Sequence, residues 1–165
     1  MKILAIYPGF DPEVNDIAFV LRYLVEQGHH VKVITARRNK SKSRQWNSLV
    51  EKWGDLEILR PYEKFFPDMI YSPSHQGSMV QSIVRGFEPD ILLCSQEFSI
   101  RLGLFITQKL GIKIPIVVVS EFAGDLFDRG YQGILANVTF PFLGMPKGKR
   151  FWPWLVHHAS AVITC

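Results

Sequence analysis

The sequence predicts a doubly wound α/β domain in three layers, with a mainly parallel sheet between two layers of helices. Short apolar runs rich in Val, Ile and Leu, without polar alternation, indicate strands that are buried on both faces. These runs alternate along the chain with helical patterns, as expected for parallel strands joined by crossover helices. The chain has 165 residues, of which 47% are hydrophobic, so it is long enough for one domain with a sizeable core.

The first elements of the chain are a strand, a helix and a second strand. Residues 2–7 form an apolar run, and the turn-forming stretch 8–12 follows it. Residues 13–27 carry apolar side chains at intervals of three and four, which predicts an amphipathic helix that ends at Gly28. Residues 30–35 form the second predicted strand.

The patterns that follow predict four more strands, separated by helices and loops. In chain order we expect a basic loop at 37–44, a short helix at 45–53, a weak strand at 56–59, a helix at 78–87, a strand at 89–95, a helix at 99–110, a strand at 115–120, an irregular segment at 125–149, a helix at 151–158 and a strand at 161–165. Because the chain ends on a predicted core strand, we expect this single domain to be a fragment of a longer protein.

Composition and charge exclude several classes of protein. The chain has only two cysteines, without metal-ligand spacing, and its first apolar run is too short for a signal peptide, so we expect a cytoplasmic protein. The net charge of +4 is compatible with contact with phosphates, but no nucleic-acid recognition motif accompanies it. The two pairs of adjacent histidines are poor metal ligands because their side chains diverge, and we expect no metal or cofactor.

Polar residues follow three of the predicted strands, at the edge where a parallel sheet binds ligands. The three segments are Gly9-Phe10-Asp11, Ser95-Gln96-Glu97, and Ser120-Glu121 with the following residues as far as Asp125. We expect the carboxylates of Asp11, Glu97, Glu121 and Asp125 to face one cleft, although each is also a residue type that any surface loop carries. The glycine-rich dinucleotide fingerprint, the P-loop and the nucleophile elbow are all missing from the sequence.

The succession of these pieces resembles the N-terminal half of a GT-B glycosyltransferase. It is carried by "MKILAIYPGF", "LVEQGHHVKVIT", "FEPDILLCS", "LGIKIPIVVVSEF" and "HHASAVITC", and family 4 of mostly retaining, nucleotide-sugar-dependent enzymes is the most similar. The resemblance implies a Rossmann-like, acceptor-binding domain of residues 1–165. The donor-binding domain would follow Cys165 and is absent from this chain.

The same resemblance implies roles for the polar residues of the sheet edge. Gly9, Phe10 and Asp11 would line the cleft, and Ser95 and Glu97 would bind acceptor hydroxyls. Glu121 and Asp125 would lie nearest the reacting sugar, and Ser120 would be a further substrate-binding residue. Asp11 or Glu121 would be the general base of an inverting enzyme. The overall match favours a retaining enzyme, in which neither acts as the base.

Two positions depart from the family pattern. The family commonly has Gly-Gly where this chain has Asp11-Pro12-Glu13. Proline has no N–H and a carboxylate repels phosphate, so this loop is a poor phosphate site. Glu121, or Ser120 if the register shifts by one, stands where the family usually has a histidine that contacts the donor sugar.

A membrane surface is a further partner that the sequence leaves open. Basic residues near Trp and Phe suit an anionic membrane, and a solvated basic loop is the alternative. The residues concerned are Arg37, Arg38, Lys40, Lys147, Lys149 and Trp152. Two other function classes also remain open: a non-catalytic ligand- or protein-binding module, and half of a nucleotide-sugar epimerase of the same architecture.

Overall fold

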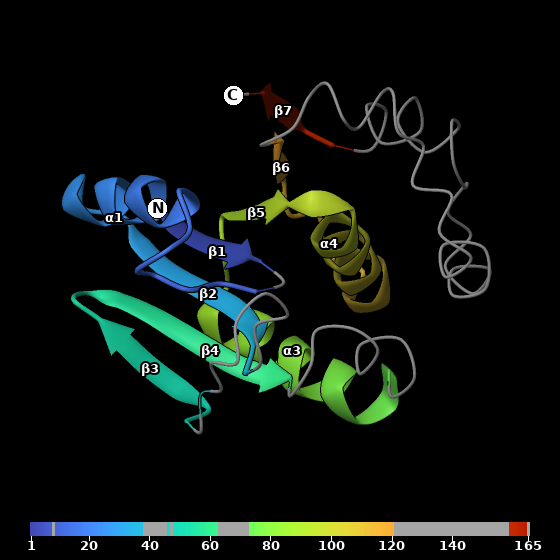
Figure 1. Cartoon of the computed structure of the whole chain (residues 1–165). Helices are drawn as coiled ribbons and strands as arrows, with labels where there is room; N and C mark the ends of the chain where they lie inside the picture. Colours follow the sequence, from blue (N-terminus) through green and yellow to red (C-terminus); the bar gives the residue numbers. More distant parts are fainter. Residues whose placement is uncertain (8, 38–45, 47, 63–72, 121–158, 165) are drawn as a thin grey trace, which may run out of the picture.

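The protein is a three-layer α/β domain built on one seven-stranded sheet (Figure 1). The computed structural model describes residues 1–7, 9–37, 46, 48–62, 73–120 and 159–164. The elements in chain order are β1 (Lys2–Ile6), α1 (Ile17–Glu26), β2 (His30–Ala36), β3 (Val50–Trp53), β4 (Leu56–Tyr62), α3 (Pro73–Phe87), β5 (Ile91–Ser95), α4 (Gln96–Leu110), β6 (Ile116–Ser120) and β7 (Ala161–Thr164).

The strand order confirms the predicted doubly wound fold. The sheet runs β3-β4-β2-β1-β5-β6-β7, and all neighbours except β3 and β4 pair in parallel. Counted without β3, the order is 3-2-1-4-5-6, which is the order of a Rossmann fold. The strands are apolar on both faces because helices cover both faces.

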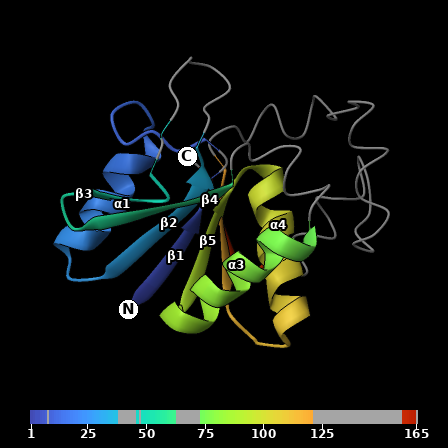
Figure 2. The same ribbon diagram turned by 90° about the horizontal axis from the view of Figure 1, so that it is seen from below.

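Two hydrophobic cores flank the sheet, one on each face. On one face, α1 packs Ile17, Ala18 and Leu21 against side chains of the central strands. On the other face, α3 and α4 contribute Val80, Val84 and several residues of α4 to the larger core. Figure 2 shows α1 on one side of the sheet and α3 and α4 on the other.

The short helix expected at 45–53 is wrong. Residues 50–53 form the edge strand β3, which pairs antiparallel with β4 from Val50↔Leu59 to Trp53↔Leu56. Gly54, with φ 59°, and Asp55 form the two-residue turn between them. β4 extends to Tyr62 and is therefore longer than the expected strand at 56–59.

Other element boundaries shift by a few residues. The helix expected from residue 13 begins at Ile17, because residues 11–15 form a hydrogen-bonded turn. Helices α3 and α4 begin earlier than expected, at Pro73 and Gln96. The helix expected at 151–158 and the irregular segment at 125–149 lie outside the described residues. Within the described ranges, no helix is both long and apolar enough to cross a membrane.

Candidate functional site

The carboxyl ends of β1, β5 and β6 meet at one edge of the sheet. β1 pairs in parallel with β5 from Ile3↔Ile91 to Ile6↔Cys94, and β5 pairs in parallel with β6. β2 lies on one side of β1, and β5 lies on the other, so the topological switch point is between β1 and β5. The chain therefore leaves β1, β5 and β6 at the same edge of the sheet.

The loop after β1 is held against the ends of β2 and β4. Phe10 is 0% exposed, and its N–H donates to the hydroxyl oxygen of Thr35 at 2.9 Å. Its carbonyl oxygen accepts a hydrogen bond from Nη1 of Arg60 at 3.2 Å. The Phe10 ring meets the edge of Tyr7, with 6.1 Å between the centroids. Gly9 is half-buried. The side chain of Phe10 is buried beneath this edge of the sheet and does not face solvent.

Asp11 is buried at the end of β1 and organises the turn that follows it. The residue is 1% exposed, and Oδ1 accepts the N–H of Glu13 at 3.1 Å. Its own N–H donates to Oδ1 of Asn15 at 2.6 Å. Its carbonyl accepts the N–H groups of Val14 and Asn15 at 3.1 and 3.0 Å. This pattern is the self-bonded turn that Asp commonly makes, and it fixes where the carboxylate lies.

The backbone of this loop has no amide left to hold a phosphate between residues 10 and 15. The N–H groups of residues 10, 11, 13, 14 and 15 all donate to groups of the protein itself, and Pro12 has none. Phosphate sites on such loops depend on backbone N–H groups that point at the ligand. The doubt that the sequence raised about phosphate contact at Asp11-Pro12-Glu13 therefore has a structural reason.

Ser95 ends β5 beside the switch point. It is 2% exposed, and its carbonyl accepts the hydroxyl of Ser99 one turn into α4. Its own hydroxyl oxygen has no hydrogen-bond partner among the described residues. It lines a cavity of about 10 Å³ together with Tyr7, Ile17 and Leu93. A cavity of that size can hold about one water molecule at most. Ser95 is therefore buried beneath the carboxyl edge of the sheet.

The remaining predicted site residues are only partly placed. Glu97 lies in the first turn of α4 and Ser120 is the last residue of β6, but their side chains are outside the described part of the structure. Glu121 and Asp125 are also outside it. Of the expected membrane-contacting residues, Arg37 is half-buried, and Arg38, Lys40, Lys147, Lys149 and Trp152 lie outside the described residues. Within those ranges, no group of three or more His, Cys, Asp or Glu is placed to hold a metal ion.

The site also contains residues that the sequence did not single out. The side-chain oxygens of Thr35 and Asn15 accept hydrogen bonds from the N–H groups of Phe10 and Asp11, respectively. Arg60 donates to the carbonyl of Phe10. One signal was present in the sequence: Arg60 is a charged residue between the apolar pair Ile58-Leu59 and Pro61. A charge at such a position is buried only when it is paired.

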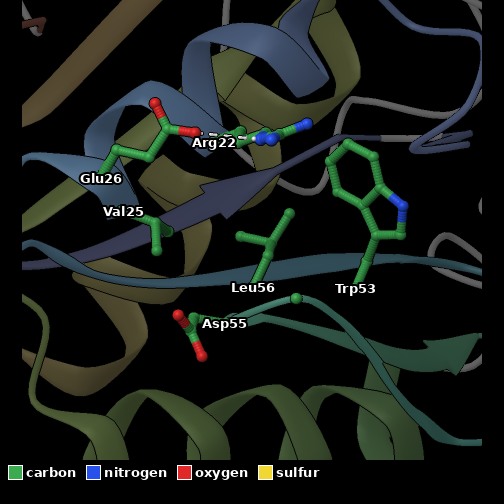
Figure 3. Close-up of a pocket in the computed structure, with 7 residues that line it drawn as sticks. Arg22, Val25, Glu26, Trp53, Asp55 and Leu56 are labelled. Carbon is green, nitrogen blue, oxygen red and sulfur yellow. Dashed lines mark hydrogen bonds and ion pairs between the residues drawn. The ribbon is translucent and has the colours of Figure 1, made fainter.

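A larger pocket lies at the opposite, amino edge of the sheet. It has a volume of about 400 Å³ and lies between the end of α1 and the β3–β4 turn. Figure 3 shows Leu56 between Val25 and Trp53, with Arg22 extending towards the Trp53 ring. Arg22 and Glu26 form an ion pair of 3.0 Å, and both side chains are more than half exposed. Since this pocket is remote from the carboxyl ends of the strands, it is not our candidate site.

Comparison with solved structures places the fold. The first comparison, sucrose-phosphate synthase from Thermosynechococcus elongatus, has 12% identity and a TM-score of 0.55, covering 76% of this chain and 34% of that protein. MurG from Acinetobacter baumannii has 14% identity and a TM-score of 0.50, covering 99% of this chain and 41% of that protein. This chain therefore shares its Rossmann-like α/β fold with part of each of these two proteins, which agrees with the resemblance to the GT-B fold.

The chain spans less than half of either protein. SsfS6, a glycosyltransferase from Streptomyces sp. SF2575, has 15% identity and a TM-score of 0.44, covering 73% of this chain and 39% of that protein. No protein-family model matches the sequence, and no curated protein matches it significantly.

Proposed function

We propose that this chain is the acceptor-binding domain of a GT-B glycosyltransferase. The complete enzyme would move a sugar from a nucleotide-sugar donor to a saccharide or lipid-linked acceptor, with retention of configuration. The proposal rests on the fold and on the switch point between β1 and β5, beside which ligands bind in sheets of this type.

The observation that carries the acceptor role is the hydrogen bonding of the loop after β1. Its N–H groups from residue 10 to residue 15 are used within the protein, so this loop offers no cradle for the donor phosphates. An uncharged saccharide needs no such cradle. Because the donor must then be held elsewhere, the complete enzyme needs a second domain for the nucleotide-sugar.

The burial of Asp11 supports retention. A general base of an inverting transferase must be within hydrogen-bond reach of the acceptor hydroxyl. Asp11 is 1% exposed, and Oδ1 is engaged by the N–H of Glu13. In the proposed enzyme Asp11 shapes the acceptor loop. Glu121, at the end of β6, is the carboxylate nearest the reacting sugar, and Asp125 and Glu97 complete the set that meets sugar hydroxyls.

The test is a transfer assay on the complete enzyme, which is this domain joined to its donor-binding domain, since we expect this domain alone to be inactive. The complete enzyme is incubated with UDP-, GDP-, ADP- and dTDP-sugars together with a panel of saccharide and lipid-linked acceptors, and the release of nucleoside diphosphate is measured. We expect release that depends on an acceptor, and α-configured product from an α-linked donor. If none of the donors gives release of nucleoside diphosphate, the enzymatic function is contradicted and a non-catalytic binding module is favoured. An epimerised nucleotide-sugar without transfer would favour the epimerase alternative.

Two variants test the site assignment in the same assay. Glu121→Gln removes the charge at the end of β6, and Asp11→Asn removes the charge in the acceptor loop. We expect both to slow transfer, by about tenfold or more for Glu121→Gln, a factor typical for loss of one charged hydrogen bond. Wild-type rates in both variants would refute the assignment.

A further inference from the structure

Arg60 is a charged residue in the interior of the sheet edge. It is 0% exposed, although it lies only two residues before the end of β4. An ionised side chain is buried only when other groups replace the water around it. The partners of Arg60 therefore indicate what it holds together.

The guanidinium joins three separate segments of the chain. Nε and Nη2 donate to the same carboxylate oxygen of Glu51 on β3, at 3.1 and 3.0 Å. Nη1 donates to the carbonyl of Ala36 at the end of β2, at 2.9 Å, and to the carbonyl of Phe10 after β1, at 3.2 Å. The Trp46 ring lies over the guanidinium, with 3.8 Å from Cζ to the ring centroid.

These contacts occupy the guanidinium with protein groups. Arginine has five N–H donors in a rigid planar fork, and four hydrogen bonds to Glu51, Ala36 and Phe10 are present. The group is therefore arranged to fix the backbone of the loop after β1. Together with the Thr35 hydroxyl, it holds Phe10 by both its carbonyl and its N–H.

The edge strand β3 supplies the counter-charge for this arrangement. β3 is the antiparallel strand at the edge of the sheet and is not one of the six parallel strands. It pairs with β4 so that Glu51 lies opposite Ile58. The side chain of Glu51 is 30% exposed and reaches over to Arg60. Loss of this carboxylate would take a negatively charged hydrogen-bond partner away from a buried guanidinium, at a considerable cost.

We propose that Arg60 is a positioning residue for the acceptor site. It holds the carbonyl of Phe10 and thereby fixes the path of the loop after β1, which shapes the acceptor site from beneath. This inference rests on the proposed function for its link to the acceptor. The positioning of the loop itself is independent of that function and is measured separately.

A matched control exists at the opposite edge of the sheet. Arg22 also has a carboxylate partner, Glu26, and a tryptophan, Trp53, with 5.9 Å from its guanidinium carbon to the ring centroid. The difference is that Arg22 is exposed and contacts no loop of the candidate site. Arg22→Lys and Arg60→Lys therefore make the same chemical change in the two places. Arg60→Lys keeps the charge but cannot reproduce the fork.

The experiment measures amide hydrogen exchange and steady-state transfer on the complete enzyme. In Arg60→Lys we expect exchange in residues 9–15 to be at least about tenfold faster, with β5 and β6 unchanged. We expect kcat/KM for the acceptor to fall about tenfold, with the donor KM unchanged. Arg22→Lys leaves both measurements at wild-type values. Glu51→Gln, which keeps Arg60 itself, gives a smaller change in the same direction and replaces Arg60→Lys if that variant does not fold.

The outcomes separate the two levels of the inference. Wild-type exchange in residues 9–15, or an equal increase in β5 and β6, overturns the positioning role. Faster exchange in residues 9–15 with equal effects on donor and acceptor KM overturns the link to the acceptor. If the wild-type protein transfers no sugar, the proposed function and its acceptor link fail together, and the exchange data alone decide whether Arg60 positions the loop.

Discussion

Thr35→Val is the substitution that most directly disturbs the hydrogen bonding of the loop after β1. Valine has nearly the same shape as threonine but no hydroxyl. Thr35 and Phe10 are both 0% exposed, and the N–H of Phe10 lies 2.9 Å from the threonine oxygen. The substitution therefore leaves a buried N–H without its acceptor.

The expected magnitude follows from that burial. A buried donor left without a partner costs about 1–3 kcal/mol, so we expect the free energy of unfolding to fall by about that amount. The same loss should make exchange of the Phe10 amide faster by about tenfold or more, since about 1.4 kcal/mol corresponds to a factor of ten. Thr35→Ser loses a methyl group worth about 1 kcal/mol but keeps the Phe10 amide protected.

Urea unfolding and amide exchange measure these two effects, and Thr107→Val on α4 is the control. The Thr107 hydroxyl donates to the carbonyl of Leu104 three residues earlier. Its loss leaves no buried N–H orphaned, and we expect a change below about 0.5 kcal/mol. Equal stability losses in Thr35→Val and Thr107→Val, with the Phe10 amide still protected, would refute the reasoning.

Two further predictions concern the core around α4 and the buried acids. Gly103→Ala would place a Cβ 2.9 Å from the sulfur of Cys94. We expect it to destabilise by about 1 kcal/mol after the gain in helix propensity. Adding Cys94→Ala should give a coupling of at least about 1 kcal/mol in a urea double-mutant cycle, and additive effects would contradict the contact. Burial raises the pKa values of Cys94 and Tyr62 well above their usual range, so both stay protonated in the native state when the unfolded chain ionises. Stability should therefore fall by about 1.4 kcal/mol per pH unit for Cys94 above about pH 9, and by the same amount for Tyr62 above about pH 10. If the melting temperature between pH 9 and 10 falls as steeply in Cys94→Ala as in the wild-type protein, the contribution of Cys94 is contradicted.

The parallel sheet and its ligand-binding edge were predictable because their signals are local. Apolar runs such as residues 91–95 and 116–120 are long enough to identify a buried strand without knowledge of its partners. Once they alternate with helices, right-handed crossovers leave few strand orders, and the carboxyl edge follows. The resemblance to the GT-B fold agreed with this architecture.

The edge hairpin was not predictable in the same way. Trp46, Leu49, Val50 and Trp53 are spaced by three, four and seven residues, which is the pattern of a helical face. The strand forms instead because Val50 and Trp53 pair with Leu59 and Leu56 of β4. That pairing is a tertiary interaction, and such interactions override local propensity.

The hydrogen bonds of the candidate site were also beyond sequence reasoning. Phe10 and Asp11 were expected to line the cleft, but both are buried, and Phe10 is held by residues of β2 and β4 that lie far away in sequence. Asp11 could be recognised as a turn residue. The hydrogen bond from Arg60 to the carbonyl of Phe10, 50 positions earlier, depends on the register of three strands.

The most direct test of the account is a backbone amide NMR titration of the isotopically labelled protein. Pyrophosphate and UDP are the anionic probes, and a panel of uncharged mono- and oligosaccharides is the alternative. We predict that the anionic probes leave the amides of residues 10, 11 and 13–15 unshifted, because each already donates a hydrogen bond to another group of the protein. We predict saturable shifts with at least one saccharide at the ends of β1, β5 and β6. Saturable shifts of the Phe10 and Asp11 amides with pyrophosphate would contradict the assignment of this edge to the acceptor.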